Sequence, residues 1–147
     1  MAASAFKVFT AAKGKFGTGG INITEECRVV LLQSGTTNLS VGLDVTTLAS
    51  ASAAGLVRFA SVGNYSLSGR VLANQSWRVS GTKWYFDATD WSLSQTADMT
   101  KILAAMILQT SGTVPLCYAS LSTATFDLST GNKLIIQFNA SGIFNLD

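Results

Sequence analysis

After residue 20, short apolar and β-branched runs alternate with turns that contain Gly, Ser or Asn. Such runs are typical of strands. The pattern predicts strands at residues 28–32, 56–60, 66–72, 77–79, 83–88, 91–93, 116–121, 126–128, 134–138 and 143–146. Many short strands with regular turn signals indicate a sandwich or a barrel. We predict an all-β single domain over residues 21–147, a two-sheet β-sandwich whose topology, jelly-roll or Ig-like, stays open.

Two further segments need a choice between helix and strand. Residues 99–109 contain the helix-favouring types Met, Lys, Leu and Ala. However, residues 102–108 are apolar on all sides, which is typical of a central strand buried on both faces. We therefore predict a strand that forms a hairpin with residues 116–121. Residues 44–54 favour a short helix, because Asp44 can cap its start and Gly55 can end it.

Residues 1–20 differ from the rest of the chain, because they contain three lysines, four glycines and no acidic residue. Glycine-rich stretches lose much entropy in a regular element, so we predict a flexible, extended N-terminal arm. The arm is either a frayed terminus or a segment that becomes ordered on a partner, with aromatic anchors. The candidate contact residues are Phe6, Lys7, Phe9, Lys13, Lys15 and Phe16.

Composition narrows the possible functions. Of 147 residues, 12% are charged, about half the usual share, whereas 17 are Ser and 16 are Thr; the net charge is +2 and no His is present. Imidazole catalysis and His-ligated metals are therefore excluded, and two cysteines cannot form a Cys-only zinc site. We expect no catalytic residue, cofactor or metal. Scattered basic residues and the lack of a long apolar run indicate neither nucleic acid nor a membrane as partner.

Four residues remain candidates for chemistry. Asp87 and Asp90, three apart, could act as an acid–base pair or bind Ca²⁺. Asx turns that bond local backbone N–H groups are the favoured interpretation. Cys27 and Cys117 lie in apolar runs, which favours buried free thiols over a disulfide.

An aromatic cluster lies between residues 77 and 91. Its members are Trp77, Trp84, Tyr85, Phe86 and Trp91. Stacked aromatics can bind sugars or single-stranded nucleic acid. Because few basic residues are interleaved, we predict core aromatics with one exposed at a subunit contact.

The last third of the chain resembles a known group. Trp91 precedes the long strand, a Pro-Leu-Cys-Tyr return follows at residues 115–118, and the chain closes with Gly-Ile-Phe-Asn-Leu at residues 142–146. Upstream, residues 64–69 (NYSLSG) match a Tyr-x-x-Gly-type segment. Together these features resemble small tailed-bacteriophage virion proteins over residues 21–147, with the arm and residues 56–63 unmatched.

The resemblance implies a non-enzymatic virion structural protein. The first hypothesis is a capsid decoration or cement protein on the outer head shell, a homotrimer whose partner is the major capsid protein. A tail- or fibre-associated module is the alternative, and a carbohydrate-binding module is a more distant one. A low-charge surface is consistent with packing against neighbours, since uncharged groups are less costly to bury.

Overall fold

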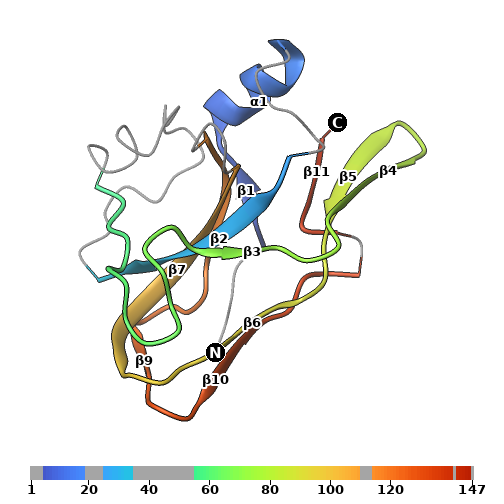
Figure 1. Cartoon of the computed structure of the whole chain (residues 1–147). Coiled ribbons are helices and arrows are strands. Elements are labelled where there is room, and N and C mark those ends of the chain that lie inside the picture. Colours follow the sequence, from blue (N-terminus) through green and yellow to red (C-terminus); the bar gives the residue numbers. More distant parts are fainter. Residues whose placement is uncertain (1–4, 19–24, 35–54, 110–113, 141, 147) are drawn as a thin grey trace.

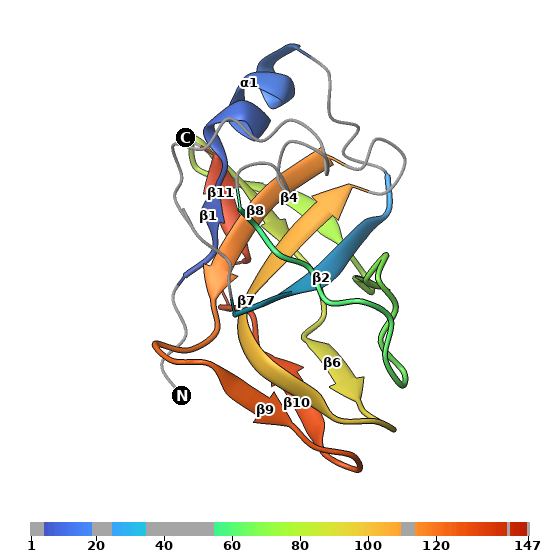
Figure 2. The same cartoon turned by 90° about the vertical axis from the view of Figure 1, so that its left-hand side faces the viewer.

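The described part of the chain folds into antiparallel sheets with one short helix (Figures 1 and 2). The computed structural model describes residues 5–18, 25–34, 55–109, 114–140 and 142–146. The helix is α1 (Thr10–Thr18), and the strands are β1 (Lys7–Val8), β2 (Cys27–Gln33), β3 (Arg70–Val71), β4 (Ser76–Ser80), β5 (Lys83–Asp87), β6 (Trp91–Ser94), β7 (Met99–Gln109), β8 (Val114–Ser120), β9 (Phe126–Leu128), β10 (Lys133–Ile136) and β11 (Phe144–Leu146). The predicted helix at residues 44–54 lies outside the described residues.

The largest sheet has six strands in the order β1-β8-β7-β2-β3, with β9 also paired to β7. Its central strand is β7, which is buried from Ala104 to Gln109 on both faces. The prediction of a strand at residues 99–109 is therefore confirmed. Its hairpin with β8 is also confirmed, with Met106 paired to Tyr118.

The described residues also form two small sheets, β10-β6 and β11-β5-β4. The segment that contains β5 and β6 runs antiparallel to the segment that contains β10 and β11. Pairing stops between the Ile136–Trp91 and Phe144–Phe86 pairs, and this break separates the two sheets. The β4–β5 hairpin extends away from the large sheet (Figure 1).

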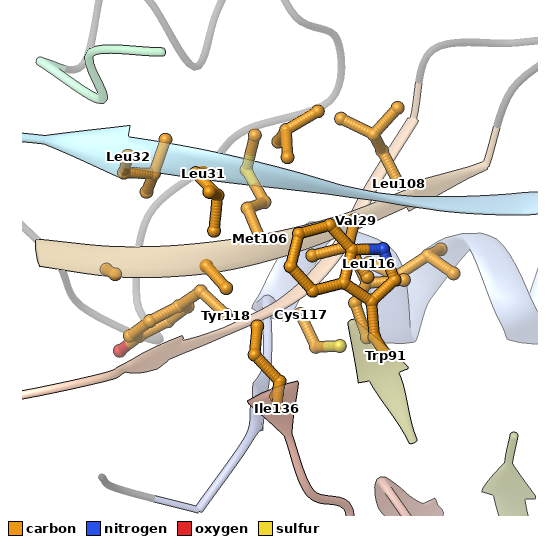
Figure 3. Close-up of a cluster of buried hydrophobic side chains, with 14 of the residues drawn as sticks. Val29, Leu31, Leu32, Trp91, Met106, Leu108, Leu116, Cys117, Tyr118 and Ile136 are labelled. Atoms are coloured by element: carbon orange, nitrogen blue, oxygen red, sulfur yellow. The ribbon is translucent and has the colours of Figure 1, made fainter. Parts of the chain in front are cut away.

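One apolar core joins the three sheets. Figure 3 shows Trp91 of β6 and Ile136 of β10 among side chains of β2, β7 and β8. Trp91 is 4% exposed, and Phe86 and Phe144 of the third sheet belong to the same buried cluster. The predicted all-β, sandwich-like class is therefore correct.

The outer edge of β2 is covered by an irregular segment. Arg58 forms an isolated bridge with Leu32, and the N–H of Phe59 donates to the carbonyl oxygen of Leu31. The strands predicted at residues 56–60 and 66–72 are thus too long. The first reduces to this bridge, and the second to β3 at Arg70–Val71, because residues 66–69 form a turn.

The N-terminal segment packs onto the large sheet. β1 pairs with β8, and the N–H of Phe9 donates to the carbonyl oxygen of Leu116 at 3.0 Å. The prediction of an extended arm is wrong over Thr10–Thr18, which is helical despite Gly14. The burial of Phe9 and Ala12 stabilises this helix more than glycine's backbone entropy disfavours it.

Candidate interaction surface

Among the described residues, the β4–β5 hairpin carries two of the most exposed large apolar side chains, and the two are cross-strand neighbours. A two-residue turn, Gly81-Thr82, connects its strands, and Gly81 has a φ of +64°, which favours glycine. The register pairs Val79 with Trp84, so both side chains lie on one face of the hairpin. They are 54% and 49% exposed, respectively.

The base of the same face is held by aromatic packing. Trp77 lies opposite Phe86, with ring centroids 4.9 Å apart, and contacts Phe144 at 5.7 Å. Phe16 of α1 packs edge-on against Trp77 at 5.3 Å. Packed aromatic rings therefore support the exposed pair near the turn. We name Val79 and Trp84 the hairpin patch.

The other face of the hairpin is polar. The Arg78 guanidinium lies over the ring of Tyr85, 5.1 Å from its centroid, and Nη2 donates to the carbonyl oxygen of Ala140 at 3.4 Å. Ser76 pairs with Asp87 on this face. One hairpin thus presents an apolar face and a face with both signs of charge.

β4 is the outermost strand of its sheet. Because the turn has two residues, Ser80 and Lys83 form the hydrogen-bonded pair beside it, and the ladder alternates from there. The backbone N–H and C=O groups of Trp77 and Val79 therefore point away from β5. Within the described part of the chain, no strand pairs with this edge.

The aromatic residues of the predicted contact segment pack within this chain. Phe9 is fully buried, and its ring contacts Tyr118 at 5.0 Å. Phe6 is half-buried against Phe138 at 5.7 Å, and Phe16 packs on the hairpin base. Phe9 is thus an anchor for this chain's own sheet, which a partner could reach only after local unfolding.

The lysines of that segment face outward to different degrees. Lys7 and Lys13 are exposed, and Lys15 is half-exposed in the last turn of α1. The prediction of one exposed aromatic residue in the cluster fits Trp84, which the sequence pattern did not distinguish from its neighbours. Its pairing with Val79 could have been found from the two-residue Gly-Thr turn between the runs at residues 76–80 and 83–87.

The two aspartates have separate structural roles. Asp87 accepts a hydrogen bond from the adjacent Ala88 N–H at 2.9 Å, so the predicted bond to a local backbone group is present, but residues 88–90 do not form the predicted turn. Asp90 instead accepts from the N–H of Phe138 at 2.8 Å. This bond bridges the break between the two small sheets. Among the described residues, no group of three potential ligands could hold a metal ion.

Both cysteines are buried free thiols, as predicted. Burial raises the pKa of Cys27 from 9.0 to about 12, with a further contribution from the carboxylates of Glu25 and Glu26. Burial also raises the pKa of Cys117 well above its ordinary value. Neither side chain is a reactive thiolate near neutral pH.

A polar depression of about 400 Å³ lies beside β6, lined by Asn64, Arg70, Ser92 and Ser94. Arg70 donates to the carbonyl oxygen of Ser92 at 3.1 Å, and Asn64 donates to that of Ser94 at 2.9 Å. Its two longest polar side chains thus bind the chain's own backbone. The lining contains no aromatic ring on which a sugar could stack.

Comparisons with known proteins add no relative. The chain matches no protein-family model, and neither curated proteins nor solved structures gave a match.

In the described part of the chain, no helix has the length and apolar character needed to cross a membrane.

Proposed function

We propose that this chain is a non-enzymatic structural protein of a tailed-bacteriophage virion, and that it binds the outer head shell as a decoration or cement protein. The observation that carries the proposal is the hairpin patch. The side chains of Val79 and Trp84 are both exposed and lie side by side on a projecting hairpin. The aromatic rings of Trp77 and Phe16 pack together at the base of the same face. Apolar groups in this arrangement favour burial against another protein.

Composition supports the same proposal. The chain has no His, and the thiols and Asp90 are used within the fold. A surface rich in Ser and Thr loses little hydration energy when it packs against a neighbour. The sequence contains neither a repeat nor a coiled-coil heptad, which disfavours a self-supporting fibre and favours the head over the tail.

The direct test locates the chain on particles. Virions of the phage that encodes it would be purified by density gradient and labelled with gold-conjugated antibodies against the chain. We expect the label over the head. A label confined to the tail would support the alternative of a tail-associated module, and its absence from intact particles would overturn the virion proposal.

A second test asks whether the hairpin patch is the surface that binds the head shell. Trp84→Ser should lower the amount of protein that rebinds to particles stripped of it. Ile135→Ser is the matched control, because Ile135 is 53% exposed but lies on β10. Equal rebinding of the wild type and both variants would show that the patch is not the docking surface.

A further inference from the structure

We propose that the open edge of β4 pairs with β4 of a second copy of this chain, antiparallel and centred on Trp77. Two three-stranded sheets would then form one continuous six-stranded sheet across a two-fold axis. This inference is independent of the virion role, because it concerns only the purified chain.

The edge has the properties that strand addition requires. Four of the five residues of β4 are exposed, and the outward backbone groups of Trp77 and Val79 face no strand among the described residues. Native sheets commonly protect such edges with an inward charge, a bulge or a proline. β4 contains no proline, and its register with β5 is unbroken from Ser76 to Ser80.

Charge restricts the register. Because Trp77 and Val79 supply the outward groups, a two-fold pairing must centre on Trp77, on Arg78 or on Val79. A centre at Arg78 places two guanidinium groups opposite each other. A centre at Val79 places Arg78 opposite the partner's Ser80, next to which lies the partner's Lys83. Both arrangements bring like charges together.

The register centred on Trp77 brings opposite charges together. It places Arg78 opposite the partner's Ser76, and the next residue across the sheet is the partner's Asp87. Two strand spacings separate the Cα atoms of Arg78 and Asp87, roughly 10 Å, a distance that an arginine can span above a small serine. To do so, the Arg78 guanidinium exchanges its contacts with the Tyr85 ring and the Ala140 carbonyl oxygen for the partner's carboxylate. The two-fold axis forms this ion pair twice.

The apolar face fits the same register. The two Trp77 side chains become neighbours at the centre, flanked on each side by Phe86 of the same chain. The ring of Trp77 is half-buried in the single chain and would become covered in the dimer. The two Trp77 residues would exchange two backbone hydrogen bonds across the axis, and the charges would select the register.

The test is a charge swap followed by sedimentation velocity over a range of concentrations. The wild type should dimerise, and Arg78→Glu and Asp87→Lys should each raise the dissociation constant by on the order of tenfold or more. The double variant should recover most of the lost affinity. Lys133→Glu, a charge reversal at an exposed position of β10, is the control and should leave dimerisation unchanged.

Lys83→Glu distinguishes the registers, because it would strengthen only a dimer centred on Val79. Thermal melts of each variant would confirm that it is folded. A monomer at all concentrations, a trimer with no dimer, a double variant no better than the single ones, or a tighter dimer with Lys83→Glu would each overturn the proposal. None of these outcomes measures binding to phage heads, although a trimer would agree with the homotrimer expected from the resemblance.

Discussion

The backbone N–H of Leu31, in the middle of β2, donates a hydrogen bond to the hydroxyl oxygen of Tyr65 at 2.8 Å. Both residues are buried, at 0% and 1% exposure, and they lie 34 positions apart. β2 lies inside the core but has no full-length neighbour on this side. The tyrosine hydroxyl thus takes the place of a strand carbonyl at the edge.

Tyr65→Phe should lower the free energy of unfolding by about 1–3 kcal/mol, because it leaves the Leu31 N–H buried without its acceptor. Tyr85→Phe is the control, since its ring remains available to the Arg78 guanidinium. Urea denaturation would measure both. Equal stability of Tyr65→Phe and the wild type would show that water replaces the hydroxyl.

Gly69 ends the turn at residues 66–69 and lies directly against the backbone of β2. It has a φ of +81°, and a Cβ added there would meet the backbone oxygen of Val29 and lie 2.7 Å from Cγ1 of Val30. Gly69→Ala should therefore destabilise the fold by more than about 2 kcal/mol, since strain and a backbone clash combine. Gly81→Ala should cost only about 1 kcal/mol, because its Cβ would point into open space. Similar losses in thermal or urea unfolding would contradict this difference.

The central strands could be predicted from sequence, because burial on both faces leaves a continuous apolar run, as in β7. The edge of β2 could not. Tyr65 and Gly69 act through contacts with residues more than thirty positions away, and local pattern carries no sign of them. Helix α1 was missed for a related reason, since its stability depends on Phe9 packing against Tyr118 rather than on propensity. The sequence alone did not show which aromatic residue of the cluster is exposed. The pairing of Trp84 with Val79 in the hairpin identifies it.

Stability should fall in alkaline solution. Burial raises the pKa of Tyr65 from 10.0 to about 12, and that of Cys27 from 9.0 to about 12. Both groups are neutral in the fold, so their contribution is complete below about pH 9 and is lost as pH rises toward about 12. Urea midpoints at about pH 8 and about pH 11 would test this, and Cys27→Ala should reduce the difference. An unchanged difference in that variant would contradict the assignment to Cys27.

Lys101 adopts a left-handed conformation inside β7, with a φ of +61°. Its N–H donates to Oδ1 of Asp127 at 2.7 Å, where the pairing of β7 with β9 shifts. Lys101→Gly should stabilise the fold by about 0.5 kcal/mol, because relief of ~1–2 kcal/mol of strain exceeds glycine's ~0.5–1 kcal/mol entropy cost. Thr100→Gly, at the adjacent exposed position, should destabilise it. A loss of stability in both variants would show that the left-handed conformation costs little.

The N-terminal segment, β1 and α1, should contribute to the stability of the folded chain whether or not it also contacts a partner. Phe9 is fully buried against Tyr118, whereas Phe6 is half-buried at the surface. Phe9→Ala should therefore lower the free energy of unfolding by about 3–5 kcal/mol, the cost of emptying a large core site. Phe6→Ala should cost less than half as much, because much of its ring already contacts solvent. Comparable losses in the two variants by urea denaturation would mean that β1 and α1 do not hold Phe9 in the core in solution.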